Sequence, residues 1–272
     1  MTPDHPSPPY NPGGMETWSL ILDEPADGAA NMAADESLLD AVGAGARGPT
    51  LRFYRWRPAC LSLGVFQRFA DYDALPADLR PPGLVRRITG GGAIWHGREW
   101  TYSVVLPRRH PLSGRDPNPL YRAVHSGIID GLGRIGVACR LRGASAPGDP
   151  AACRASPCRD ELFCFTRGDP NDIVAPDGRK IVGSAQRRLE SAVLQHGSIV
   201  LETPPGSPTA TSVADQLGRP ADEAAVLAAC RDALADRLGV TWRADALSAD
   251  EAARARALVL SKHTHPDWLR RK

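Results

Sequence analysis

Lys180 is the first residue of this sequence whose type and position suggest chemistry, because it opens an apolar, strand-like run. Residues 175–178 read Ala-Pro-Asp-Gly, a tight-turn sequence in which proline fixes φ and glycine accepts a positive φ. Apolar pairs at 173–174 and 181–182 flank this turn, so the segment predicts a β-hairpin whose second strand begins at Lys180. Such a lysine is either a solvated charge on an edge strand or a cation directed into a cleft.

A second stretch that could take part in binding or catalysis is the triple glycine at residues 90–92. Glycines let a backbone approach another group closely. The arginine pair 86–87 precedes them, and Trp95 and His96 follow. A P-loop is excluded because no Gly-Lys-Ser/Thr follows, and the dinucleotide-binding pattern G-x-G-x-x-G is absent. The polar and aromatic neighbours favour a ligand cradle over a plain loop.

Length and composition describe a globular protein with one or two domains. The chain has 272 residues, 42% of them hydrophobic, and a net charge of +2. A charge this close to zero predicts neither nucleic acid nor an anionic membrane as a partner. No apolar run reaches the roughly 20 residues that span a bilayer. We expect free thiols at the six cysteines, Cys60, Cys139, Cys153, Cys158, Cys164 and Cys230.

The N-terminal residues 1–16 are rich in proline and glycine and lack the basic-then-apolar pattern of a signal peptide. We therefore expect a disordered lead-in and a cytoplasmic protein.

Hydrophobic patterns predict a mixture of strands and helices around these motifs. Residues 93–96 and 100–106 are predicted to form a returning hairpin. Further strands are predicted at residues 17–22, 51–56, 61–65, 85–88 and 137–142.

Four segments have helical patterns. A first helix over residues 27–39 can use Asp27 or Asn31 as its N-cap. Residues 120–135 form an amphipathic helix, in which Val124, Ile128 and Leu132 give the apolar stripe and His125 lies off it as a surface histidine. Further helices are predicted over residues 221–238 and 247–262, the latter with a capping box of Ser248 and Glu251.

Taken together, these motifs resemble the superfamily of lipoate–protein ligases and octanoyltransferases, whose catalytic domain is shared with biotin–protein ligases. The resemblance spans about residues 18–238. The matching segments read ANMAADESLL, LRFYRWRPACLSLGVFQ, RRITGGGAIWH, EWTYSVVLP and GRKIVGSAQRR followed by LQHGSIVL.

The resemblance implies a fold of the α/β (α+β) class, with a mixed central sheet flanked by helices as in biotin and lipoate protein ligase catalytic domains. The catalytic domain would cover residues 17–240, and residues 241–272 would be a short C-terminal helical extension.

The resemblance also implies an apolar tunnel for a medium-chain acyl group. Lys180 would contact the acyl carbonyl, where a buried cation polarises the oxygen. The cradle for the acyl group or acyl-adenylate would comprise Arg87, Gly90, Gly91, Gly92 and His96. The opposite wall would comprise Gly183, Ser184, Gln186, His196 and Gly197.

Two activities occur on this scaffold, and the first is transfer of octanoyl from acyl carrier protein. That branch forms a thioester on a cysteine in a Cys-Phe step ahead of the lysine, and Cys164-Phe165 lies sixteen positions before Lys180. A nearby lysine cation lowers the pKa of a thiol, and the thiolate is the nucleophile. The acceptor would be a lysine of a lipoyl-domain or glycine-cleavage H-type protein. No cofactor is needed, because the thioester conserves the acyl energy.

The second activity is ATP- and Mg²⁺-dependent ligation of lipoate, which uses an asparagine–aspartate pair that Asn171 and Asp172 match. Only 34 residues, 239–272, follow Leu238, which is short for the accessory domain of many ligases. We therefore favour the transferase. A non-catalytic acyl-binding or acyl-relay module is a third hypothesis, and biotin ligation fits the motifs less well.

Overall fold

A large mixed sheet organises the molecule. The computed structural model describes residues 15–144, 168–205, 207 and 209–271. Within these residues, eight strands pair in the order β11-β1-β2-β6-β10-β9-β8-β7, with parallel pairs only at β11-β1-β2. In this order the strands are β11 (Val240–Asp245), β1 (Glu16–Leu22), β2 (Thr50–Tyr54), β6 (Glu99–Pro107), β10 (Ala192–Val200), β9 (Lys180–Arg188), β8 (Ile173–Val174) and β7 (Arg140–Leu141). The predicted mixed sheet is confirmed.

A smaller sheet carries the glycine-rich stretch. In the described part of the chain it has three strands, in the order β4 (Gly83–Arg86), β3 (Cys60–Leu63) and β5 (Ile94–His96). The predicted hairpin of β5 with β6 is wrong, because β5 pairs with β3 instead. The reason is that β2 and β10 occupy both edges of β6, which leaves β5 no free edge.

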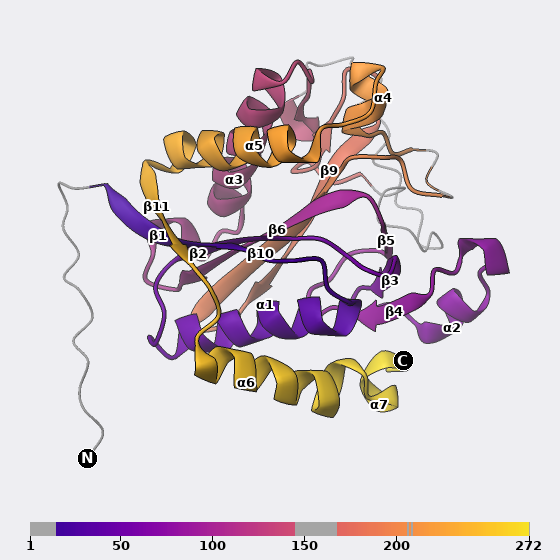
Figure 1. Cartoon of the computed structure of the whole chain (residues 1–272), viewed down its shortest axis with the longest axis vertical. Coiled ribbons are helices and arrows are strands. Elements are labelled where there is room, and N and C mark those ends of the chain that lie inside the picture. Colours follow the sequence, from indigo (N-terminus) through magenta and orange to yellow (C-terminus); the bar gives the residue numbers. More distant parts are fainter. Residues whose placement is uncertain (1–14, 145–167, 206, 208, 272) are drawn as a thin grey trace.

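Helices cover both faces of the large sheet (Figure 1). α3 (Asn118–Arg134) and α5 (Glu223–Leu238) pack together on one face. α1 (Gly28–Gly43) and α6 (Ala249–Leu258) lie on the other. The shorter helical segments are α2 (Phe69–Asp73), η1 (Ala77–Leu79), η2 (Pro111–Ser113), η3 (Arg142–Ala144), α4 (Val213–Leu217), the π-helical turn Val259–His263 and α7 (Pro266–Leu269).

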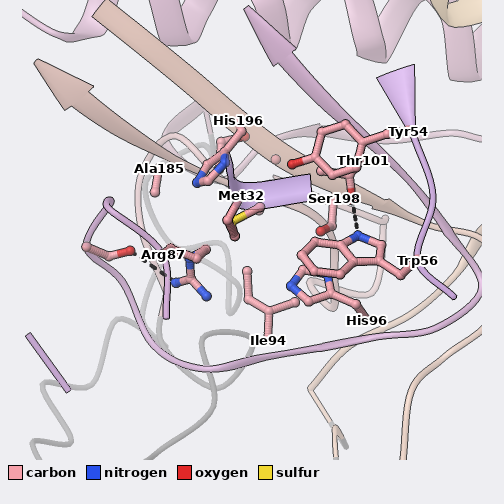
Figure 2. A pocket seen from close by; sticks show the side chains of 14 residues that line it. Met32, Tyr54, Trp56, Arg87, Ile94, His96, Thr101, Ala185, His196 and Ser198 are labelled. Atoms are coloured by element: carbon pink, nitrogen blue, oxygen red, sulfur yellow. Dashed lines mark hydrogen bonds between the residues drawn. The ribbon is translucent and has the colours of Figure 1, made fainter. Parts of the chain in front are cut away.

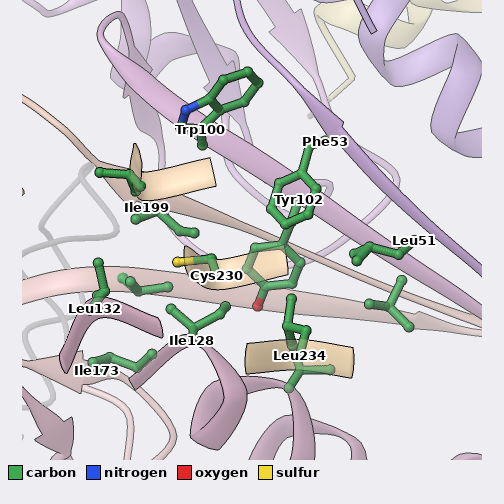
Figure 3. Packing of buried hydrophobic residues seen from close by; sticks show 14 of the residues in the cluster. Leu51, Phe53, Trp100, Tyr102, Ile128, Leu132, Ile173, Ile199, Cys230 and Leu234 are labelled. Carbon is green, nitrogen blue, oxygen red and sulfur yellow. The ribbon is translucent and has the colours of Figure 1, made fainter. Parts of the chain in front are cut away.

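The main hydrophobic core lies between the sheet and the α3–α5 layer (Figure 3). The predicted stripe of α3 is buried there, since Val124, Ile128 and Leu132 are all inaccessible to solvent. They meet Tyr102 of β6 and Leu234 of α5. The α3–α5 layer therefore supports the back of strands β6, β9 and β10.

Local signals set the helix starts as expected. Asp27 caps α1, where its carboxylate accepts a hydrogen bond from the Ala30 amide at 2.8 Å. Ser248 and Glu251 form the predicted capping box of α6, each side chain bonding the other residue's amide. These caps satisfy amides that have no partner inside the helix.

The predicted hairpin around Lys180 is confirmed. β8 and β9 pair antiparallel, and Lys180 is the first residue of β9. The turn is closed by a hydrogen bond from the Gly178 amide to the Ala175 carbonyl at 2.9 Å, with Gly178 at a φ of +81°.

The C-terminal part of the chain joins the main sheet before it turns helical. β11 pairs in parallel with β1, so the boundary expected at residue 240 falls at the start of a sheet strand. α6 then packs on α1. None of the described helices combines the length and apolar character that crossing a bilayer requires.

Candidate functional site

One pocket lies between α1, the smaller sheet and the β9–β10 pair (Figure 2). Its empty volume is about 360 Å³, counting the part open to solvent. Its lining mixes apolar groups with a few polar ones. The lining residues are Met32, Tyr54, Trp56, Arg87, Gly90, Ile94, His96, Thr101, Gly183, Ser184, Ala185, His196, Gly197 and Ser198.

Lys180 lies at the edge of this pocket as half of a buried ion pair. Its side chain is 2% exposed, and Nζ is 2.7 Å from Oδ1 of Asp172. Burial raises the pKa of Asp172 above its ordinary value, although Lys180 opposes the shift. The carboxylate therefore depends on the neighbouring ammonium to offset the cost of its burial.

The Lys180 side chain packs closely against the backbone of Gly183. A Cβ atom on Gly183 would lie 2.5 Å from Cε of Lys180 and 2.8 Å from Nζ. The lysine therefore crosses over the bare backbone of a pocket-lining residue. Lys180 is 2% exposed and therefore not a solvated edge charge, whereas its action as a cation directed into the cleft stays a prediction.

Arg87 shapes the glycine loop from within. Its buried guanidinium donates from Nη2 to the carbonyls of Gly90 at 3.1 Å and Gly92 at 2.9 Å. Nη1 donates to the carbonyl and Oγ of Ser62 at 2.7 and 2.6 Å. Gly91, with a φ of +93°, forms the exposed turn between the two bonded carbonyls. The cation thus fixes the loop and borders the cavity.

A directed hydrogen-bond chain continues from Ser62 to His96. His96 Nδ1 donates to Oε1 of Glu99 at 2.8 Å, and His96 Nε2 lies 2.6 Å from Oγ of Ser62. Because Nδ1 carries the proton, Nε2 accepts from the serine. Burial lowers the pKa of His96, which keeps the ring neutral as this chain needs. The ring stacks on Trp56 at 3.7 Å and forms one end of the lining.

His196 is held in the same manner on the opposite wall. Its Nδ1 donates to Oδ2 of Asp35 at 3.1 Å, and Nε2 lies 2.8 Å from Oγ1 of Thr89. Asp35 also accepts from Arg52 and Tyr54, both at 2.8 Å. Although burial raises the pKa of Asp35, these partners outweigh it and hold that pKa below its ordinary value. Both histidines are therefore oriented by buried acids.

The expectation of a surface position for His125 is wrong. The residue is 1% exposed. Its Nδ1 donates to the carbonyl of Asn171, and Nε2 lies 2.6 Å from Oγ of Ser184. His125 precedes Ile128 by three residues and Leu132 by seven, so it lies at the border of the apolar stripe. It ties the segment carrying Asp172 to strand β9.

The structure brings half of the predicted site residues together at the pocket. Those lining it are Arg87, Gly90, His96, Gly183, Ser184, His196 and Gly197. Lys180 contacts the lining residue Gly183, the Gly92 carbonyl accepts from Arg87, and Gly91 follows Gly90 in the chain, whereas Asp172 is joined to the lining only through Lys180. Asn171 contributes its backbone carbonyl to His125. Gln186 is not among the lining residues and bonds Gln195 at 2.9 Å. Cys164 and Phe165 lie outside the described residues.

Sequence reasoning missed the other half of the lining, which comes from strands and a helix predicted only as structure. These residues are Met32, Tyr54, Trp56, Ile94, Thr101, Ala185 and Ser198. Trp56 and Thr101, which share a hydrogen bond of 2.8 Å, come from separate segments that pairing with β6 brings together. No local spacing signals such a contact.

Comparison with known proteins shows the family of the chain. The model of the lipoyl protein ligase A/B catalytic domain matches residues 27–230. The chain belongs to this family. The octanoyltransferase LipM of Symbiobacterium thermophilum is 36% identical over 95% of this chain and 100% of its own length. The octanoyltransferase LipM of Kyrpidia tusciae is 33% identical over the same shares.

Solved structures show that the family fold extends over most of the chain. A putative lipoate protein ligase of T. acidophilum superposes with a TM-score of 0.73 at 22% identity, covering 94% of this chain and 99% of its own. A lipoate-protein ligase A bound with ATP gives a TM-score of 0.73 at 24% identity, with the same coverage. The described sheets and helices therefore have the family architecture.

Proposed function

We propose that this protein is an octanoyltransferase of lipoate biosynthesis. The donor is octanoyl-acyl carrier protein, and the acceptor is a lysine of a lipoyl-domain or glycine-cleavage H-type protein. The observation that carries the proposal is the similarity to two octanoyltransferases over their full lengths. The reaction requires neither nucleic acid nor a membrane, and we place it in the cytoplasm.

The proposed reaction has two steps through a thioester. The Cys164 thiolate attacks the octanoyl carbonyl, and the thiol of the carrier leaves with a proton. The acceptor lysine amine then attacks the Cys164 thioester, forms the amide and regenerates the thiol. Support for Cys164 comes from the sequence, where the Cys-Phe step precedes Lys180 by sixteen positions.

Lys180 would serve both steps. As a cation it stabilises the Cys164 thiolate and the charge that develops on the carbonyl oxygen. Its pair with Asp172 offers a place for the proton that moves between thiol and leaving group. The pocket beside Gly183 would hold the octanoyl chain against Met32 and Ile94.

The alternative function is ATP-dependent lipoate ligation, which the Asn171–Asp172 pair suggests. In this structure both carboxylate oxygens of Asp172 already have partners within the protein. Oδ1 pairs with Lys180, and Oδ2 accepts from the Asp169 amide at 2.8 Å. These oxygens do not fit an Mg²⁺ ion, which binds through free carboxylates. ATP with Mg²⁺ belongs only to the alternative, since a thioester would conserve the acyl energy in the transferase.

A transfer assay with and without ATP separates the hypotheses. The purified chain is incubated with octanoyl-acyl carrier protein and a lipoyl domain, and the domain is weighed by mass spectrometry. We expect an octanoylated domain without ATP. Acyl-AMP and pyrophosphate formed from free lipoate would instead establish the ligase. Acyl binding without transfer under either condition would establish a non-catalytic module.

A further inference from the structure

Arg86, the first arginine of the pair before the glycine loop, is fully buried and links two distant segments. Its Nη1 donates to the carbonyls of Gly64 at 2.8 Å and Gln67 at 2.7 Å. Nε donates to the carbonyls of Trp268 and Leu269, both at 3.1 Å, and Nη2 donates to Leu269 at 2.9 Å. The Trp268 indole donates back to the Arg86 carbonyl at 3.0 Å. Both segments are therefore joined by one side chain.

The first of these segments supports the glycine loop directly. A Cβ atom on Gly64 would lie 2.1 Å from the carbonyl oxygen of Gly91, so the two backbones are in contact. The next residue, Val65, donates its amide to the Thr89 carbonyl at 2.8 Å. Gly90, between Thr89 and Gly91, lines the pocket. A shift of Gly64 would therefore displace the glycine loop, including the pocket-lining Gly90.

The second segment is α7, which has anchors of its own. Lys262 Nζ lies 4.3 Å from the centre of the Trp268 ring, and the His263 ring meets it edge-on at 6.3 Å. The Arg270 guanidinium lies over Phe69 of α2 at 4.6 Å. α7 is therefore held in place independently of Arg86 and can serve as a fixed support.

We propose that α7 positions the glycine loop of the acyl pocket through Arg86. The guanidinium makes five hydrogen bonds to carbonyl oxygens, and a buried charged donor that loses its acceptors carries a large desolvation cost. Without α7, Nε and Nη2 lose the acceptors described above and the group turns toward water. Gly64 and Gln67 are then released, and the loop loosens. Arg86 and Trp268 are positioning residues, and only the link to acyl binding rests on the proposed function.

One shortened chain, two point variants and one control variant test the proposal. A chain that ends at His265 lacks α7, Trp268→Ala removes the ring, and Trp268→Phe keeps most of the packing without the N–H donor. Arg254→Ala is the control, because it breaks a tie between α6 and Asp40 of α1 at 2.9 Å without touching the loop. Two quantities are measured: hydrogen exchange of the amides in residues 64–67 and 88–92, and KM and kcat for octanoyl-acyl carrier protein.

We expect faster exchange of these amides in the shortened chain and in Trp268→Ala, a smaller change in Trp268→Phe, and none in Arg254→Ala. KM should rise about tenfold in the shortened chain with kcat nearly constant, a coupling of ordinary size. Unchanged loop exchange in Trp268→Ala overturns the proposal. If the shortened chain does not fold, Trp268→Ala is the variant that tests the proposal. The exchange readout needs no substrate. A wild-type chain that does not use the octanoyl donor would therefore count against the proposed function alone.

Discussion

A buried lysine is the residue on which the proposed chemistry depends. Lys180 opens β9, pairs with Asp172 and packs against the backbone of Gly183, which lines the pocket. The pair is buried, so replacing one partner leaves the other in an unfavourable environment. Both the position and the charge of the lysine are therefore set by neighbours within the same hairpin.

Gly183→Ala tests whether Lys180 needs the bare backbone beneath it. The added methyl would overlap Cε and Nζ, so the ammonium must move. We expect kcat to fall about 100-fold, since an error of about 1 Å in a reacting group has that effect. The melting temperature should change much less.

Gly48→Ala is the matched control for this variant, because no atom lies within 4 Å of the added Cβ. Equal activity of Gly183→Ala and the wild-type chain would show that Lys180 does not act from its observed position.

At the scale of elements, the α3–α5 pair supports the back of the sheet that carries the site. Gly131 of α3 lets the two helices touch, since a Cβ there would lie 2.6 Å from Cα of Cys230 and 2.9 Å from the Ala229 carbonyl oxygen. Backbone atoms cannot yield as a flexible side chain can. The contact therefore fixes the distance between the helices.

Gly131→Ala should destabilise the protein by about 1–3 kcal/mol through overpacking, measured by urea unfolding. Gly133→Ala in the same helix has open space around its Cβ and should stabilise by about 0.5–1 kcal/mol through helix propensity. Similar effects of the two substitutions would contradict this account of the helix contact. KM should stay constant in both, because neither residue lines the pocket.

Elements with a local signal could be predicted from the sequence, whereas contacts between elements could not. The hairpin at Lys180 follows from its Pro-Asp-Gly turn, and the α6 start follows from Ser248 and Glu251. The partner of β5 depends on which edges of β6 are already occupied, which no local pattern states. The burial of His125 likewise depends on Ser184, 59 positions away.

At the scale of the whole molecule, a buried histidine links stability to pH. Burial, opposed by the bond to Asn171 and assisted by nearby Lys180, lowers the pKa of His125 from 6.5 to about 4. The folded state then binds fewer protons than the unfolded state between these two values. Stability is therefore fully present above pH 6.5 and falls as the pH drops toward 4.

The loss over this pH range should be at most about 3 kcal/mol for His125. We expect His125→Gln to flatten the dependence of unfolding free energy on pH, measured by urea titrations from pH 7 to pH 4. Some slope should remain, because burial also lowers the pKa values of His96 and His110. A His125→Gln slope equal to wild type would contradict the buried neutral state.

The proposed function depends on passage of an acyl group through a thioester on Cys164, assisted by Lys180. The most direct measurement is mass spectrometry of the intact protein after incubation with octanoyl-acyl carrier protein, without ATP and without acceptor. We predict one octanoyl group per chain, mapped to the peptide that contains Cys164 and released by hydroxylamine. Cys164→Ser should carry no such thioester and should transfer nothing to a lipoyl domain. An unmodified wild-type protein that still octanoylates the domain, or a fully active Cys164→Ser variant, would contradict the account.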